Sequence, residues 1–382
     1  TTQSAPVRPL AGTKDSGPQE TANVGRARTH TPPFGAAIPH TQPRAAATTL
    51  KGGCVQNMTN TAWAFAQLKY KNKTFFNSIS SEAINSLSSF RERDMTIMAW
   101  SFARREVADA PLLDALAAQA ISSMRDFETQ NLANTPWSCS ALGFVHSPLL
   151  HAIASASIAN IREFSAQDLS STAWSMSKLA VPPAPLLAAI SSASLARISD
   201  FGPRGCSNTV WAFAKLTVPD PPLLTAISAA SLAIIREFDA QGLSNTAWSF
   251  APLAVGDVPL LNAIAAAARP RINVFAARNL ANLAWAYARL GVRDRPLLHS
   301  ISAASISRMP EFVPQNVSNT AWSCAVLPFG DRPLLSALSA SALARLSEAS
   351  CQDLSNIAWS FSTLAVADEP LLDAIASASR KT

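Results

Sequence analysis

Tryptophan occurs at one fixed interval in this sequence. Each of the nine tryptophans stands 37 residues from the next, and the series contains all of them: Trp63, Trp100, Trp137, Trp174, Trp211, Trp248, Trp285, Trp322 and Trp359. Only a tandem repeat produces such spacing, and periods of roughly 20 to 50 residues are typical of stacked supersecondary units. The sequence therefore predicts a repeat array, a class that more often presents extended binding surfaces than catalytic pockets.

Alignment on tryptophan divides the chain into two parts. No unit has an insertion or deletion, and the nine units start at Met58, Met95, Leu132, Leu169, Cys206, Leu243, Leu280, Val317 and Leu354. We expect a solenoid over residues 53–382. Residues 1–52 are rich in Thr, Pro and Arg and poor in acids, which is typical either of a targeting or linker segment or of a plain disordered tail.

Each unit accommodates two helices. Helix A is expected to begin just after a phenylalanine such as Phe238 and to run to about Leu253 and Val255. Ser165 and Ser350, each with an aspartate three residues on, have the pattern of capping boxes. Helix B begins at a Pro-Leu-Leu element, and in six units an aspartate stands two residues before the proline, which suits an N-cap.

These patterns predict an all-α fold, an α-solenoid of nine tandem 37-residue two-helix repeats. Because helix A is apolar on two sides, we expect the tryptophans to be fully buried between helices. The first unit replaces Pro-Leu-Leu with Thr74-Phe75-Phe76, as in an end cap. The ninth unit stops inside helix B, so either the array ends abruptly or the sequence is truncated.

Residues that carry out catalysis are not evident. The five cysteines form no CxxC pair, which fits a reducing compartment, and Cys139, Cys206 and Cys324 are expected to be small buried apolar residues. The five histidines have no spacing for a metal or a triad, and no glycine loop for phosphate is present. Asp200-Phe201-Gly202 spells a kinase motif, but sibling units read Glu-Phe or Asp-Phe there. We expect neither an enzyme nor a cofactor, metal or small-molecule substrate. No apolar run is long enough to span a membrane.

The motif Leu-Ser-Asn-Thr-Ala-Trp-Ser-Phe-Ala-x-Leu followed by Pro-Leu-Leu resembles the octotricopeptide and heptatricopeptide repeat families, which are related to the FAST-kinase-domain proteins. The resemblance covers residues 58–382, and the 37-residue period is closer to the heptatricopeptide kind. It implies a mitochondrial protein, or alternatively a plastid one, that binds single-stranded RNA selectively to process, stabilise or translate it, with organellar ribonucleoprotein or ribosome components as further partners. Family members often end in a RAP domain, a nuclease-like module, and nothing similar follows these repeats, so nuclease activity is not implied.

The residues of helix A support RNA binding independently. Counted from the unit start, positions two, three, seven, ten and fourteen are expected to share a face that lines the concave side. The first fourteen positions of the units hold eight basic residues and one acid, which indicates a continuous positive track. Position three is Asn in seven units, whereas position ten varies. The candidate RNA-binding residues are Asn134, Asn208, Asn245, Asn282, Asn319, Arg104, Lys178, Lys215, Arg289 and Arg293.

Other interpretations of the same residues remain open. The asparagines are equally suited to hydrogen bonding the backbone of a neighbouring repeat, and position ten is also what a tolerant surface looks like. At the level of function, the alternative to an RNA-binding solenoid is a protein-binding scaffold of the HEAT or armadillo kind without RNA affinity. The location of the basic face and salt-dependent RNA affinity distinguish the two.

Overall fold

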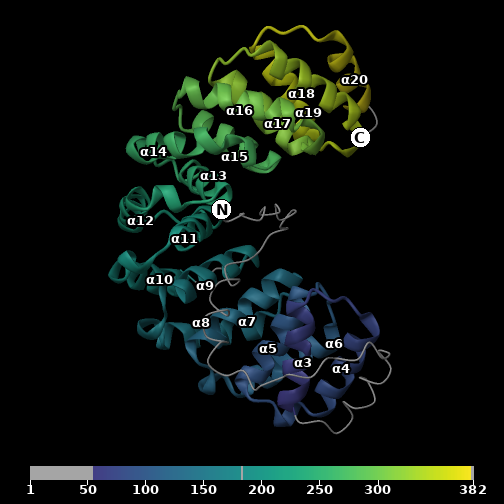
Figure 1. The fold of residues 1–382 in the computed structure, drawn as a ribbon, viewed down its shortest axis with the longest axis vertical. Helices are drawn as coiled ribbons and strands as arrows, with labels where there is room; N and C mark the ends of the chain where they lie inside the picture. Colours follow the sequence, from purple (N-terminus) through teal and green to yellow (C-terminus); the bar gives the residue numbers. More distant parts are fainter. Residues whose placement is uncertain (1–54, 182–183, 380–382) are drawn as a thin grey trace, which may run out of the picture.

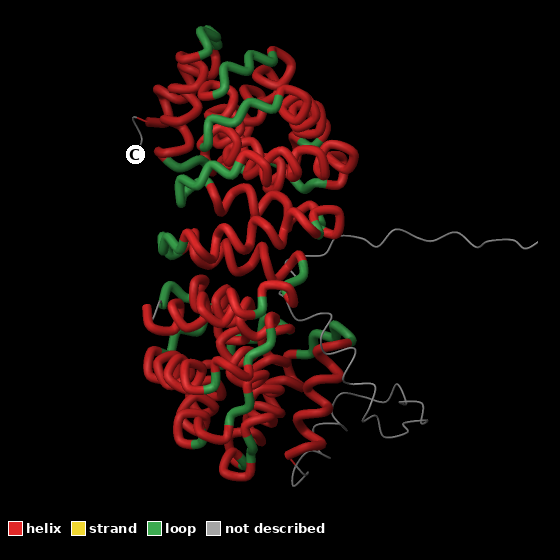
Figure 2. Tube along the Cα trace, turned by 90° about the vertical axis from the view of Figure 1, so that its left-hand side faces the viewer, coloured by secondary structure: helices red, strands yellow, loops and turns green. Residues whose placement is uncertain are grey.

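The computed structural model describes residues 55–181 and 184–379, and this part of the chain is an α-solenoid. It contains eighteen α-helices and eight short 3₁₀ helices, and no strand occurs among the described residues. Figure 1 shows the helices following one another along an arc, and Figure 2 shows the same stack from the side. The predicted fold class is confirmed. The predicted tail, residues 1–52, lies outside the described residues.

The helices alternate between two layers. The A helices are α3 (Val55–Gln67), α5 (Glu92–Arg104), α7 (Thr129–Leu142), α9 (Ala166–Lys178), α11 (Pro203–Lys215), α13 (Ala240–Phe250), α15 (Ala277–Arg289), α17 (Pro314–Val326) and α19 (Cys351–Thr363). The B helices are α4 (Lys73–Asn85), α6 (Ala110–Ser122), α8 (Ser147–Ala159), α10 (Ala184–Ala196), α12 (Pro221–Ala233), α14 (Val258–Ala268), α16 (Arg295–Ser307), α18 (Arg332–Ala344) and α20 (Glu369–Ser379). The A helices line the inner, concave side of the arc (Figure 1).

A 3₁₀ turn joins each B helix to the next A helix. These turns are η2 (Leu87–Ser89), η3 (Met124–Asp126), η4 (Ile161–Glu163), η5 (Ile198–Asp200), η6 (Ile235–Glu237), η7 (Arg269–Val274), η8 (Met309–Glu311) and η9 (Leu346–Glu348). The residue after most of them is a fully buried phenylalanine, such as Phe238 or Phe312, which anchors the turn in the core. The Asp200-Phe201-Gly202 sequence is one of these junctions, with Phe201 buried.

The capping predictions are confirmed. In all six units with aspartate, its carboxylate accepts a hydrogen bond from the backbone N–H three residues on, as Asp294 Oδ1 does from the N–H of Leu297 at 2.8 Å. His146 and Asn72 fill the same position in two units without aspartate. Ser165 and Ser350 both form the expected capping boxes. Each B helix therefore starts at a fixed point in its repeat.

Helix A ends earlier than predicted. In eight of the nine repeats the twelfth residue of the unit has a left-handed backbone, with φ between 52° and 69°. Only Gly143 and Gly291 among these are glycines; Ala254 is one of the others. The following N–H bonds back across the helix end, as from Val255 N to Phe250 O at 3.1 Å, in the manner of a Schellman motif. In α13 the helix stops at Phe250, and Pro252 offers no N–H to extend it.

The main core lies between the two layers. It is built from the first, fifth and eighth positions of the A helices, such as Leu243, Ala247 and Phe250, packed against the Leu-Leu and Ile of the B helices. Along the stack the A helices contact one another through small side chains and lie closer together than the B helices do. The hydroxyls of Thr96 and Thr135, from α5 and α7, lie 3.3 Å apart at one such contact. Small residues between the A helices thus explain why that side is concave.

The burial predicted for three cysteines is confirmed. Cys139, Cys206 and Cys324 are buried, and burial raises the pKa of Cys139 and Cys324 to about 12 and that of Cys206 to about 11. They behave as small core residues. Cys351, for which the sequence made no prediction of burial, is the first residue of α19 and is exposed. Cys54 lies outside the described residues.

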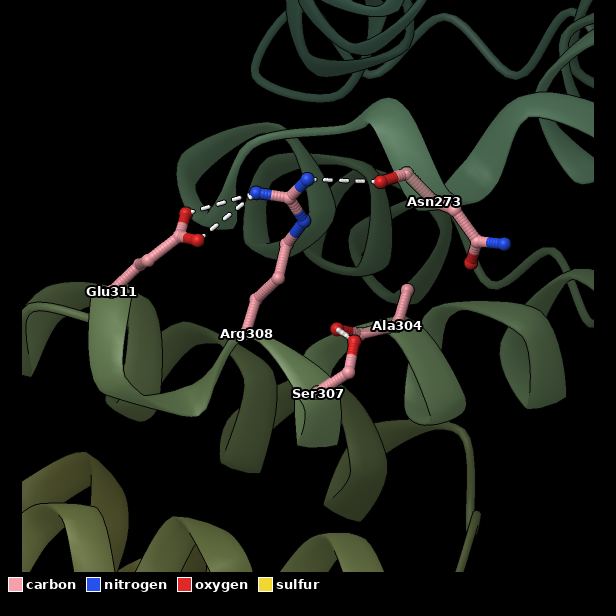
Figure 3. A network of polar contacts seen from close by, with 5 residues as sticks. All are labelled: Asn273, Ala304, Ser307, Arg308 and Glu311. Atoms are coloured by element: carbon pink, nitrogen blue, oxygen red, sulfur yellow. Dashed lines mark hydrogen bonds and ion pairs between the residues drawn. The ribbon is translucent and has the colours of Figure 1, made fainter. Parts of the chain in front are cut away.

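Arginines at the ends of B helices join successive repeats. The Arg308 guanidinium donates to the carbonyl of Asn273, one repeat earlier, at 2.9 Å and pairs with Glu311 at 3.0 Å (Figure 3). Arg197 and Arg345 reach back in the same way to the carbonyls of Arg162 and Pro310. These three cations hold adjacent repeats together, and they lie apart from the inner layer.

Candidate nucleic-acid interface

On the inner side, each A helix exposes side chains to solvent at four positions of its repeat. The buried positions are the first, second, fourth, fifth, seventh and eighth in nearly every unit. Accessible surface remains at the third, sixth and tenth positions and at the residue two before the unit start. These four are separated by four, three and four residues, which places them on one helix face. We call this face the inner stripe.

The buried positions correct part of the sequence prediction. Positions two and seven were expected on the polar face, but residues such as Ser244 and Ser249 are fully buried between neighbouring A helices. Position fourteen was also expected there, but Arg293 lies in the loop between α15 and α16, beyond the left-handed Gly291. Helical spacing does not continue past that turn, so Arg293 is not part of the inner stripe.

The tryptophans form the sixth-position row of the stripe, and the prediction that all are fully buried is wrong. Trp100 and Trp137 are 6% and 5% exposed, but Trp359 is 48% exposed and the other six are half-buried. The reason is geometric: successive helical residues are about 100° apart, so the sixth position turns away from the core that the fifth enters.

Successive indoles are in contact along the row. The ring centroids are 6.3 Å apart for Trp174 and Trp211, 6.1 Å for Trp248 and Trp285, and 6.4 Å for Trp285 and Trp322. Trp100 and Trp137 belong to a separate small cluster with Ala66 and Ala103. The tryptophan row therefore forms a nearly continuous aromatic floor along the concave side.

The asparagines form the third-position row, one turn before the tryptophans. Asn134, Asn208, Asn245, Asn282 and Asn319 are all half-buried. The backbone carbonyls of Asn134, Asn245 and Asn319 accept hydrogen bonds from seventh-position serines, as from Ser249 Oγ to Asn245 O at 2.6 Å. Within the described residues, the side-chain amides of the last four of the five asparagines make no hydrogen bond. For these four asparagines, the described residues contain no side-chain hydrogen bond to a neighbouring repeat.

The tenth-position row carries the predicted cations on the last turn of the A helices. Arg104, Lys178, Lys215 and Arg289 all lie in this row, as predicted, but Ala141 and Pro252 interrupt it. The Lys178 ammonium lies 4.9 Å from the Trp174 ring centroid, and the Arg104 guanidinium lies 5.8 Å from that of Trp100. Cations and aromatic rings are thus adjacent on one surface.

The fourth row was missed in the sequence analysis. The residue two before every unit start is Gln or Arg, and it is the second residue of each A helix. These residues, the Gln/Arg row, are Gln56, Arg93, Gln130, Gln167, Arg204, Gln241, Arg278, Gln315 and Gln352. All are exposed or half-buried. The signal was present in the sequence, but counting each unit from five residues before its tryptophan assigned this row to the end of the preceding unit.

The inner stripe is positively charged. It contains seven cations: Arg93, Arg204, Arg278, Arg104, Lys178, Lys215 and Arg289. None of its four rows contains an acidic residue. Three of the arginines stand at helix N-termini, where the helix dipole favours acids and disfavours cations. The helix dipole therefore does not account for the arginines at this position.

Other kinds of site have less support in the described part of the chain. No group of three or more His, Cys, Asp or Glu side chains is arranged there to hold a metal ion. None of the described helices has the length and apolar character needed to cross a membrane.

A family model matches much of the chain. The model of the family described as RNA-editing substrate-binding complex 6 protein (RESC6) matches residues 49–295, roughly two thirds of the sequence. The match covers the first six repeats and part of the seventh, including most of the inner stripe. No curated protein matches the chain.

Proposed function

Because the chain belongs to the RNA-editing substrate-binding complex 6 family, we propose that it is an RNA-binding component of an RNA-processing assembly and that its inner stripe is the RNA site. The family name supports an association with RNA and with a multiprotein complex. The geometry supports a binding mode in which a single strand follows the concave side of the arc (Figure 1).

One observation carries the proposal: cations and aromatic rings share a stripe that holds no acid. Arginines and lysines neutralise phosphates and release counterions, which supplies sequence-independent affinity. Tryptophan surfaces and Asn amides offer stacking and hydrogen bonds to unstacked bases, the combination that single-strand binding proteins use. The arginines that join repeats, such as Arg308, are occupied elsewhere and do not contribute to this surface.

Several finer features belong to the same proposal. We infer that one repeat addresses about one nucleotide, giving a footprint of roughly eight or nine bases. We place the protein in mitochondria, where RNA-editing complexes of this kind typically act. We assign it a binding role without chemistry of its own, with protein components of the assembly as further partners. The resemblance to octotricopeptide and heptatricopeptide repeats is consistent with this role and remains a prediction.

The test uses two cations of adjacent repeats. Changing Lys178 and Lys215 together to Ala removes two phosphate contacts. Affinity for single-stranded RNA is then expected to fall across all sequences, and the slope of log affinity against log salt to decrease by about 1.4, since each contact contributes about 0.7. Filter binding over about 50–200 mM salt measures both quantities.

The matched control removes two cations outside the stripe. Arg162 and Arg236 are exposed and occupy equivalent positions in η4 and η6. Changing both to Ala alters the net charge equally and is expected to leave the slope unchanged. If the folded wild-type protein has no RNA affinity at low salt, the proposal is wrong and the protein-binding scaffold takes its place.

A further inference from the structure

The Gln/Arg row combines variation with constant hydrogen-bonding capacity, which distinguishes it from the other rows of the inner stripe. The tryptophan row is invariant and the asparagine row nearly so, hence neither distinguishes one repeat from another. The tenth-position row varies, but Ala141, Pro252 and Val326 have no side-chain donor or acceptor for a base edge. Only the Gln/Arg row differs between repeats while keeping a planar, two-pronged polar group in all nine.

The two residue types of the row, glutamine and arginine, recognise different bases. An arginine guanidinium donates two hydrogen bonds to O6 and N7 of guanine, and a glutamine amide pairs with N6 and N7 of adenine. In single-stranded RNA these edges are accessible because the bases are unstacked. A choice between Gln and Arg at a fixed helical position is therefore a choice between two purines.

The location of the Gln/Arg row supports direct contact between these side chains and the bases of a bound RNA. The row stands on the first turn of each A helix, one turn before the asparagines and two before the tryptophans, on the same accessible face. Arg93, Arg204 and Arg278 are exposed there despite the unfavourable helix dipole. Acidic residues, which that dipole favours at the same position, occur in none of the nine repeats.

We propose that the Gln/Arg row determines the sequence specificity of the RNA site, with each arginine selecting guanine and each glutamine selecting adenine, one nucleotide per repeat. This inference rests on the RNA-binding function proposed above. The three arginines stand three and then two repeats apart. The selected RNA is therefore expected to contain three guanines, spaced three and two nucleotides apart, with adenines between them. The order of the two spacings gives the direction of the strand along the array.

The experiment is a selection from a randomised RNA pool with the full chain, followed by the double variant Arg204→Gln with Gln241→Arg. This exchange leaves composition and net charge unchanged, but it moves the central arginine by one repeat. The guanine spacings are expected to change from three and two to four and one. At each exchanged position the base preference is expected to shift by roughly 5- to 150-fold, the range of a bidentate base contact.

A second variant separates reading from charge. Arg204→Lys keeps the cation but loses the planar pair of donors, so overall affinity is expected to remain while the guanine preference at that position is lost. This inference is overturned, but the RNA-binding function is not, if the selected RNAs have no fixed guanine spacing. The same holds if the double variant Arg204→Gln with Gln241→Arg selects the same spacing as the wild-type protein. A folded protein that captures no RNA from the pool overturns both.

Discussion

The inner and outer layers of the solenoid use helices of similar length in different ways. In α9 eight of thirteen residues are buried, whereas in its partner α10 five of thirteen are. An A helix is enclosed by its B helix and by two A neighbours, so a single stripe remains accessible. A B helix exposes a broad outer face. The inner layer therefore leaves room for variation only along the stripe, and side chains placed there serve the concave surface.

The largest expected effect contrasts the core between the layers with the tryptophan row. Phe250 is 1% exposed and fills that core. Phe250→Ala is expected to cost about 3–5 kcal/mol of unfolding free energy, by the usual penalty for emptying a buried aromatic site. Trp248 lies two residues earlier and is half-buried. Trp248→Ala is expected to lower the unfolding free energy by only about 2 kcal/mol, because part of the indole surface is already in water. Denaturant unfolding measures both, and equal losses would contradict the difference between these positions.

A second comparison places the same change in each layer. Ala286 is fully buried in α15, between neighbouring A helices, whereas Ala266 is exposed on α14. Ala286→Leu is expected to destabilise the protein by about 1–3 kcal/mol, because a well-packed site has no space for three extra carbons. Ala266→Leu is expected to change stability by less than about 0.5 kcal/mol. If the two variants unfold at the same denaturant concentration, close packing of the A helices is not what shapes the inner side.

The smallest expected effect concerns the arginines that join repeats. Arg308→Ala removes the hydrogen bond to Asn273 and the pair with Glu311, on a side chain that is 31% exposed. The expected cost is about 1 kcal/mol. Arg236 is exposed and makes no polar contact with the described residues, so Arg236→Ala serves as the control. RNA affinity is expected to be unaffected in both variants. A loss of RNA affinity in Arg308→Ala alone would indicate that the outer layer takes part in binding.

Sequence patterns were sufficient for the architecture because each pattern has a local cause. The 37-residue period, the Asp-x-Pro helix starts and the Ser-x-x-Asp capping boxes all act within a few residues, and the structure contains each of them. The end of helix A was harder to predict. In several repeats the left-handed residue is Ala180, Thr217 or Ala254 and not glycine, so the sequence contains no residue there that predicts a left-handed turn.

The candidate site was predicted less completely, because helix A is apolar on more than one side. Periodicity alone does not say which apolar side faces the B layer, and the tryptophans were assigned to the wrong one. Lys178 and Lys215 lie on the last turns of α9 and α11, where four-residue spacing still holds, and their role in binding stays a prediction. Arg293 does not lie on such a turn, because that spacing ends at Gly291.

The tryptophan row also determines what light the protein emits. All nine tryptophans of the chain stand in this one row, and the sequence has only two tyrosines. Intrinsic fluorescence therefore originates almost entirely from the concave side, and the neighbouring indoles, with centroids 6.1–6.4 Å apart where they are in contact, are close enough to exchange excitation energy. A molecule that binds the inner stripe therefore quenches a coupled set of tryptophans and not a single one. Tryptophan fluorescence measured during a titration then reports binding to this surface, with almost no signal from binding to the outer layer.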